Sequence, residues 1–142
     1  MNTDVIPSLS RVRTISGVIA DIKSLFKAIV LIANILPVFV GFWLALHFSN
    51  ASFMDNLNLF ILTITGSTVL MAGALVLNNW YDVDIDTVME RTQKRPTVTG
   101  NISLKAVLAL GVILSVLGLI LLLFTSIEAT IYGFIGWFTY VI

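Results

Sequence analysis

Long apolar runs alternate with short polar segments along this chain. Three runs are long enough to cross a bilayer as a helix, which takes about 20 apolar residues. They are about Ala28 to Phe48, Leu57 to about Tyr81, and Ala106 to Phe124. A fourth run starts near Ala129 and would rise only about 21 Å by Ile142, less than the ~30 Å hydrocarbon core. We therefore expect an all-α membrane protein, a transmembrane helix bundle with three full spans plus a truncated fourth.

Composition agrees with a membrane protein and excludes several other classes. Hydrophobic residues make up 58% of the 142 residues and charged residues 11%, and the mean hydropathy is +1.00. Soluble domains carry about 25% charged residues, so this chain has too few charges to cover a water-facing surface. The apolar content also excludes a disordered chain. The absence of cysteine excludes disulfides, thiolate metal sites and cysteine nucleophiles.

The basic residues indicate how the chain is oriented in the membrane. All eight Lys and Arg lie either before the first apolar run or between the second and the third. Two crossings separate these segments, so both fall on one side, which the positive-inside rule places in the cytoplasm. We expect a cytoplasmic N-terminal segment over 1–27, with an interfacial stretch at Ile19 to Lys27. The transmembrane domain over 28–142 then contains a cytoplasmic loop over 82–105.

Polar side chains recur at the cytoplasmic end of the second run. Asn78, Asp82 and Asp86 are each four residues apart, and residues four apart lie on one face of an α-helix. Asp84 is two residues off this face and points roughly the other way. The sequence therefore predicts one amide and two carboxylates in a row about 12 Å long.

Oxygen ligands in such a row suit Mg²⁺, which takes one or two carboxylates and completes its shell with water and phosphate oxygens. The row is too long to close around one ion, so it favours ions that bridge to a polyanionic substrate. Arg91, Lys94 and Arg95 follow closely and are candidates for binding phosphate oxygens. The alternative is a solvated interface without a ligand, although carboxylates that enter a membrane are costly and usually functional.

The stretch from Leu77 to Gly100 resembles a known motif. The pattern NxxxDxxxD at residues 78–86, followed by RTxxRP at residues 91–96, resembles the first aspartate-rich motif of the UbiA superfamily of intramembrane prenyltransferases. The fuller sequence, NNWYDVDIDTVMERTQKRPTVTG, is most similar to the protoheme IX farnesyltransferases, or heme O synthases, within that superfamily.

This resemblance implies a bundle of about nine transmembrane helices and an enzyme that transfers an isoprenoid from its diphosphate to an acceptor. It implies that Mg²⁺ is held by Asn78, Asp82 and Asp86, and that Asp82 and Asp86 serve catalysis by promoting departure of the diphosphate. A second aspartate-rich motif lies further along family members, so the present sequence alone is expected to be inactive. The diphosphate contacts that it implies are Asn78, Arg91, Lys94 and Arg95.

Heme O synthases alkylate the 2-vinyl group of protoheme IX with farnesyl diphosphate. The resemblance implies these two substrates, the bacterial plasma membrane, and partner proteins from the heme A pathway or oxidase assembly. No nucleic-acid partner is expected. Three alternatives stay open: a UbiA-type enzyme acting on an aromatic quinone precursor, a transporter or channel fragment with an acidic cation site, and a non-catalytic assembly subunit. Transporter coupling sites lie near the bilayer midplane, whereas these acids lie at a cytoplasmic end.

The faces of the second run predict where an isoprenoid and a neighbouring helix would lie. Gly66 and Gly73 lie about 120–140° from the Asn78 face at 100° per residue, so they should contact another helix. If Asn78 faces the diphosphate, the isoprenoid should run along the residues on its own face. Those within about 40° of Asn78 are Ser67, Met71 and Ala74.

Small and polar residues in the other runs predict further contacts. Gly111, Ser115 and Gly118 share a face of the third run, and small residues at such spacings let helix backbones approach closely. In the first run, Asn34 lies one turn before Pro37. We expect Asn34 either to hydrogen bond a neighbouring helix or to face a cavity.

Overall fold

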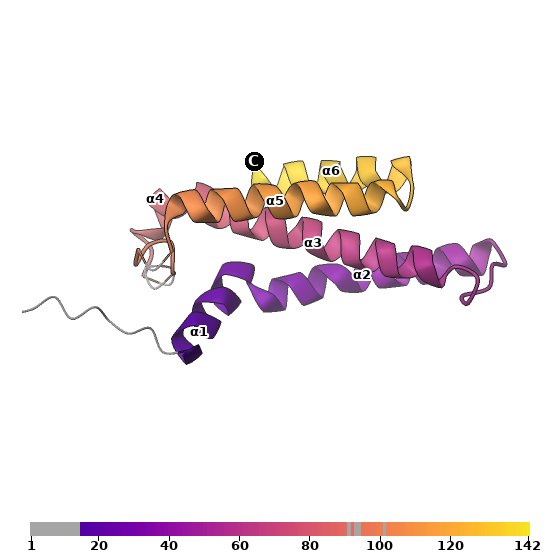
Figure 1. Ribbon diagram of the computed structural model, residues 1–142, viewed down its shortest axis with the longest axis horizontal. Helices are drawn as coiled ribbons and strands as arrows, with labels where there is room; N and C mark the ends of the chain where they lie inside the picture. Colours follow the sequence, from indigo (N-terminus) through magenta and orange to yellow (C-terminus); the bar gives the residue numbers. More distant parts are fainter. Residues whose placement is uncertain (1–14, 91, 93–94, 101) are drawn as a thin grey trace, which may run out of the picture.

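The computed structural model describes residues 15–90, 92, 95–100 and 102–142. Long helices dominate this part of the chain and run roughly side by side (Figure 1). In chain order they are α1 (Ile15–Phe26), α2 (Ala28–Phe48), α3 (Leu57–Tyr81), α4 (Val83–Asp86), α5 (Leu104–Leu123) and α6 (Ile127–Val141).

Three of these helices are long and apolar enough to cross a membrane within the described residues: Ile29–Phe48, Leu57–Tyr81 and Leu104–Leu123. This confirms the three predicted spans and a multi-pass membrane protein. The third span starts two residues earlier than predicted. The Ser103 hydroxyl accepts a hydrogen bond from the Ala106 amide at 3.2 Å, and such a cap lets the helix begin immediately after it.

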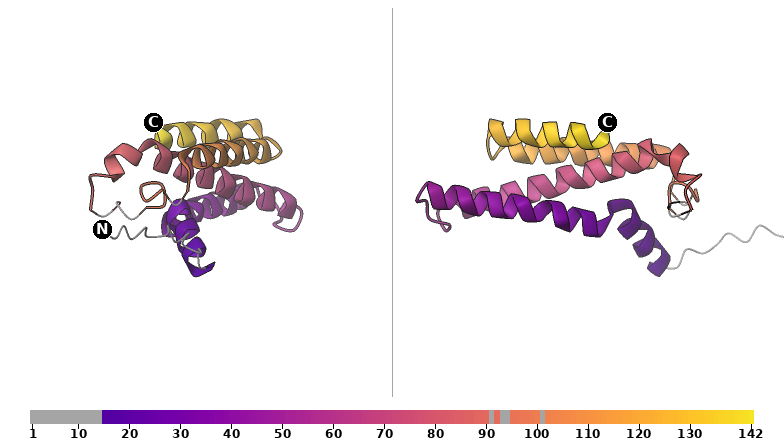
Figure 2. Two further views of the ribbon diagram at one scale, coloured as in Figure 1. Left: turned by 60° about the vertical axis from the view of Figure 1, so that its left-hand side comes forward. Right: turned by 180° about the vertical axis from the view of Figure 1, so that it is seen from behind.

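The helix α3 lies at the centre of the bundle and contacts each of the other helices. Its most extensive packing is against α5, while α2 lies on its other side (Figures 1 and 2). The helix α6 packs on both α3 and α5. The Trp137 indole nitrogen donates a 2.8 Å hydrogen bond to the Ser115 hydroxyl, which itself donates to the Gly111 carbonyl at 2.7 Å. These bonds fix α6 to α5.

The glycines of α3 lie at its closest approach to α5, as predicted. A Cβ added at Gly73 would lie 2.5 Å from the Ser115 hydroxyl oxygen and 2.6 Å from the Ser115 amide nitrogen. A Cβ at Gly66 would lie 3.1 Å from the Leu121 side chain. From the other helix, Gly118 lies directly against the Leu70 backbone. Small residues on both helices therefore allow the two backbones to pack closely.

The helix α1 is packed against the bundle at the end of α3 that leads into α4. Leu25 is buried in one cluster with Val76 and Val107. The Asn79 side-chain nitrogen donates a buried 2.6 Å hydrogen bond to the Leu25 carbonyl. Lys27 then ends α1 with a left-handed backbone (φ 44°, ψ 57°) and redirects the chain into α2. Figure 2 shows α1 turning away from the axis of α2.

The described cations of the two basic segments, Lys23 and Lys27 on one and Arg95 and Lys105 on the other, belong to connections at the same end of the bundle. The junction of α1 and α2 and the connection of α4 to α5 are at one end, and the α2–α3 and α5–α6 connections are at the other (Figure 1). This arrangement matches the number of crossings that the sequence predicts. The cytoplasmic location of that end, and the division of the chain at residue 27, remain predictions.

Thiol labelling tests the predicted orientation. Ser52, between α2 and α3, and Thr99, between α4 and α5, are both exposed. We expect an impermeant thiol reagent to label Ser52→Cys in intact cells and to label Thr99→Cys only after permeabilisation. Permeabilised cells control for reactivity, because both cysteines should then react. Labelling of position 99 but not position 52 in intact cells would reverse the orientation.

Candidate active site

The predicted acidic row continues through a break in the helix. Regular α3 ends at Tyr81, and the short helix α4 follows Asp82. The Asp82 amide donates to the Asn78 carbonyl at 2.9 Å, and the Asp86 amide donates to the Asp82 carbonyl at 2.8 Å. These two bonds keep the four-residue helical spacing that the sequence predicts, so the three side chains follow one another turn by turn.

The two aspartates of α4, Asp84 and Asp86, differ sharply in their surroundings. Asp86 is 3% exposed and forms an ion pair with Arg95, whereas Asp84 is exposed. A buried carboxylate is costly unless it is paired, and Arg95 supplies that pairing. The sequence predicts phosphate binding by Arg95; the structure places its guanidinium on Asp86.

The connection after α4 folds back over Asp86. The Thr92 hydroxyl lies 3.1 Å from the Asp86 carbonyl and 3.2 Å from the Met89 carbonyl, both acceptors for its proton. Thr92 is itself buried. This contact holds the start of the connection near α4 and so brings Arg95 within reach of Asp86. The other two predicted phosphate-binding residues, Arg91 and Lys94, lie outside the described residues.

Lys27 is a residue of this site that the sequence did not identify. Its ammonium nitrogen donates a 2.8 Å hydrogen bond to the Asn78 side-chain oxygen. Its position in the sequence could have indicated a role in the site, because Lys27 is the last cation before the first span. The predicted crossings also place it on the same side of the membrane as the 82–105 loop. Only the packing of α1 against α3 shows that it reaches Asn78.

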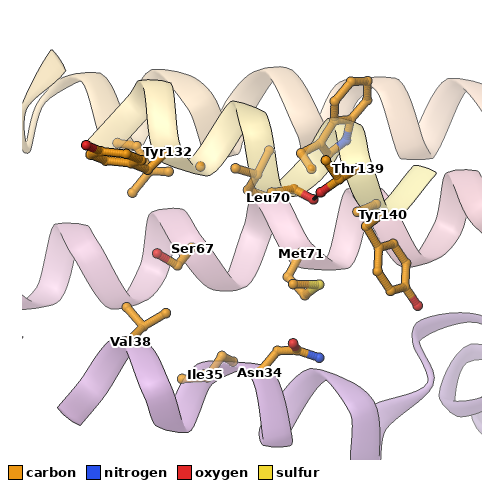
Figure 3. A pocket seen from close by; sticks show the side chains of 14 residues that line it. Asn34, Ile35, Val38, Ser67, Leu70, Met71, Tyr132, Thr139 and Tyr140 are labelled. Carbon is orange, nitrogen blue, oxygen red and sulfur yellow. Dashed lines mark hydrogen bonds between the residues drawn. The ribbon is translucent and has the colours of Figure 1, made fainter. Parts of the chain in front are cut away.

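A pocket of about 380 Å³ lies between α2, α3 and α6 (Figure 3). Ser67, Met71 and Ala74, which the helical spacing places on the face of Asn78, line it from α3 together with Leu70. Asn34 also faces the pocket, and its side-chain nitrogen bonds the Val30 carbonyl of its own helix at 2.8 Å. The cavity-facing alternative for Asn34 is therefore the one that the structure supports.

Tyr140 connects the pocket to the acidic end of α3. It lines the pocket from α6, with its hydroxyl pointing away from that helix (Figure 3). It also lies close enough to Asp82 and Arg95 to interact with both charges. Local spacing gives no signal for this contact, because α6 is far from these residues in the sequence. On α3 itself the lining of the pocket ends at Ala74, one turn before Asn78.

Comparison with known proteins decides the family. The sequence profile described as the UbiA prenyltransferase family matches residues 34–142. The chain belongs to the UbiA prenyltransferase family. This membership favours a prenyltransferase over the transporter, channel and assembly-subunit alternatives.

Curated relatives that are similar to this UbiA family member share one name, protoheme IX farnesyltransferase. A protoheme IX farnesyltransferase of Oceanobacillus iheyensis is 47% identical over 135 residues, which cover 95% of this chain and 43% of that protein. Protoheme IX farnesyltransferase 2 of Bacillus subtilis is 50% identical over 122 residues, which cover 86% of this chain and 40% of that protein. This chain therefore spans about two fifths of the length of these relatives. No solved structure matches the chain.

The side chains that this UbiA family member presents fit Mg²⁺ as part of a complex with a phosphate ligand. The donors at the end of α3 are the carboxylates of Asp82 and Asp86 and the amide of Asn78, and Mg²⁺ prefers oxygen ligands. Among the described residues, no group of three or more His, Cys, Asp and Glu side chains gathers as a cation cage. Two carboxylates are sufficient for Mg²⁺ where substrate phosphates and water complete its shell.

Proposed function

We propose that the full-length protein transfers the farnesyl group of farnesyl diphosphate to a vinyl group of protoheme IX and so makes heme O. The observation that carries this proposal is the layout of α3. Its pocket-lining residues end at Ala74, one turn before Asn78, and the acidic residues follow at the end of the same helix. A prenyl diphosphate has the same division, with a charged head joined to an apolar tail. The names of the relatives support farnesyl and protoheme as the two substrates.

The apolar tail lies in the pocket in this proposal. Met71 and Ala74 form its wall on α3, next to the turn that carries Asn78. Burial of apolar surface contributes about 25 cal/mol per Å², so the tail supplies much of the binding free energy. The pocket also keeps water away from the reacting carbon, which would otherwise be hydrolysed.

The reaction breaks the bond between farnesyl C1 and the diphosphate oxygen, and the electron pair leaves with the diphosphate. C1 then bonds the terminal vinyl carbon of protoheme. Water adds a hydroxyl group to the other vinyl carbon and loses a proton. Mg²⁺ bound with the substrate supplies positive charge that stabilises the departing diphosphate.

The residues of this chain orient the diphosphate for that step. Asp82 and Asp86 provide the carboxylates for the metal, with Asn78 one turn earlier. Arg95 holds Asp86 in place and adds positive charge beside it. Arg91 and Lys94 are proposed to contact the diphosphate as well. Donors fixed before the reaction stabilise developing charge without reorganising.

We place this site at the cytoplasmic face of the bacterial plasma membrane, where water-soluble Mg²⁺ and diphosphate have access to it. The two basic segments at that end of the bundle support this orientation. Proteins of the heme A pathway or of oxidase assembly are the proposed partners, because they would consume the product.

A product assay tests the proposed function. Purified full-length protein is incubated with farnesyl diphosphate, Mg²⁺ and either heme b or an aromatic quinone precursor, and the products are identified by mass spectrometry. We expect the hydroxyethylfarnesyl product only in the heme reaction, and loss of product when a chelator removes Mg²⁺. A prenylated aromatic product with no heme product would contradict the proposal.

Enlarging Ala74 tests the position of the prenyl tail. Ala74 is 1% exposed and lines the pocket, so a phenylalanine ring there would occupy space proposed for the isoprenoid. We expect Ala74→Phe to raise the KM for farnesyl diphosphate several-fold more than the KM for geranyl diphosphate. Val116→Phe, at an exposed position of α5, is the control and should leave this ratio unchanged. An unchanged ratio in well-folded Ala74→Phe would place the tail elsewhere.

A further inference from the structure

Asn34 is a polar side chain inside a helix that is able to span the membrane. It belongs to α2, whose apolar span runs from Ile29 to Phe48, and it faces the pocket between α2, α3 and α6 (Figure 3). A polar group away from water is costly unless it is hydrogen bonded, and polar groups within a membrane often serve a function. The amide of Asn34 therefore calls for a hydrogen-bonding partner.

The two ends of the Asn34 amide differ in how they are used. Its side-chain nitrogen donates a 2.8 Å hydrogen bond to the Val30 carbonyl, four residues earlier on the same helix. This bond fixes the orientation of the side chain. Within the described part of the chain, no donor bonds the side-chain oxygen of Asn34. An amide oxygen has two lone pairs, so this atom is an acceptor at the wall of the pocket.

The depth of Asn34 in the bundle places it close to the reacting carbons of the proposed function. Lys27 bonds Asn78 at 2.8 Å, and α2 runs from there antiparallel to α3 (Figure 1). Asn34, seven residues after Lys27, lies about 10 Å deeper, level with Met71. Farnesyl C1 is proposed to lie between the acidic end of α3 and the tail, near Ala74. Asn34 is thus within about one helical turn of that level.

The other polar side chains of the pocket are already bonded or lie at other depths. Trp137 and Thr139 donate their hydrogens to acceptors within the protein. Ser67 lies about 10 Å farther from the acidic end of α3 than Ala74 does. Tyr140 interacts with the charges at that end. The side-chain oxygen of Asn34 is therefore the acceptor best placed for the reacting carbons among the described residues that line the pocket.

The proposed reaction requires a water molecule in this region. When C1 bonds the terminal vinyl carbon, the inner vinyl carbon is left with a positive charge. That carbon either bonds a water oxygen and becomes a hydroxyethyl group, or its neighbour loses a proton and an alkene forms that is lighter by one water. An apolar pocket excludes bulk water, so the hydroxyl product needs one water held in place. Polar protein groups hold such buried waters.

We propose that Asn34 positions this water through its side-chain oxygen and so directs the reaction to the hydroxylated product. The inference rests on the proposed function, because it requires the vinyl cation. The amide oxygen accepts a hydrogen bond from the water, which leaves a water lone pair directed at the inner vinyl carbon. This lone pair forms the new C–O bond. The proton that the oxygen then loses passes to the diphosphate released in the first step.

The ratio of the two farnesylated products tests this role. Full-length protein is incubated with farnesyl diphosphate, Mg²⁺ and heme b, and the hydroxyl and alkene products are quantified by mass spectrometry. We expect Asn34→Leu to raise the alkene-to-hydroxyl ratio about 10-fold, the effect of losing one hydrogen bond that orients the water. Asn34→Gln keeps an amide and should restore most of the hydroxyl product.

Asn56→Leu is the matched control. The Asn56 side-chain nitrogen also bonds a carbonyl four residues earlier, that of Ser52 at 2.9 Å, but Asn56 does not line the pocket. The product ratio should therefore be unchanged in this variant. A ratio that shifts as much in Asn56→Leu as in Asn34→Leu would overturn the proposal, because the effect would then not come from the pocket.

A purely structural role for Asn34 predicts a different result. It would lower the yield of folded protein or the rate of both products together, and an unchanged ratio in folded Asn34→Leu would overturn the proposal. Asn34→Val provides the same test if the leucine variant does not fold. An equally high alkene share in Asn34→Gln would also overturn it. If the unmutated protein makes neither farnesylated heme, the proposed function itself fails, which is a distinct result.

Discussion

Replacing Asp82 with asparagine in the full-length protein is expected to lower heme O formation by at least about 100-fold, as loss of one charge-stabilising group does in other active sites. Asp82 follows the last residue of α3, and its loss would remove one of the two carboxylates proposed to hold the metal. The amount of protein in the membrane should stay normal, which separates lost chemistry from lost folding.

Asp86→Asn should reduce heme O formation as strongly as Asp82→Asn does. This substitution has two effects, because it removes a proposed metal ligand and also breaks the ion pair with Arg95. This carboxylate is the partner of Arg95, and removing one member of a buried ion pair destabilises a protein by about 3–5 kcal/mol, less where a partner is partly exposed as Arg95 is. Asp84→Asn is the control, because Asp84 is exposed and should retain most activity. Equal losses at all three positions would contradict the one-sided arrangement of the acids.

Gly73→Ala is expected to destabilise the bundle by about 3 kcal/mol, at the upper end of the range of about 1–3 kcal/mol that overpacking typically costs. The new methyl group would lie 2.6 Å from the Ser115 backbone nitrogen, and backbone cannot rotate away as a flexible side chain does. The helices α3 and α5 would have to separate. Thermal unfolding in detergent and the yield of folded full-length protein measure this effect.

Gly41→Ala is the matched control for this substitution. Both glycines lie inside long helices, but a Cβ at Gly41 meets nothing within 4 Å. Alanine favours a helix over glycine by up to about 1 kcal/mol, so Gly41→Ala should be neutral or slightly stabilising. Similar unfolding temperatures for the two variants would mean that α3 and α5 do not pack through Gly73.

The sequence predicted those features that depend on neighbours along the chain. The spans were predictable because a bilayer demands an unbroken apolar run, and the four-residue spacing of Asn78, Asp82 and Asp86 places them on successive turns of any helix. The same arithmetic separated the Gly73 face from the Met71 face. The starts of α5 and α6 were each placed two residues late, since a hydropathy run does not register the serine caps at Ser103 and Ser126.

The contacts between distant segments were not predictable in this way. The bond from Lys27 to Asn78 and the approach of Tyr140 to Asp82 depend on how each helix is rotated and where it crosses its neighbour. Local spacing contains neither quantity. The pairing of Arg95 with Asp86 depends on the path of the connection after α4. The sequence indicated that Arg95 is near the acids, but not which acid its charge would satisfy.

The most direct measurement of the proposed function is the heme content of a bacterial strain that lacks its own heme O synthase and expresses the full-length protein. Hemes are extracted from the membranes and identified by liquid chromatography and mass spectrometry. We expect heme O to appear with the unmutated protein and to be absent with Asp82→Asn at equal expression. Membranes that contain the folded, unmutated protein but only heme b would contradict heme farnesylation by this protein.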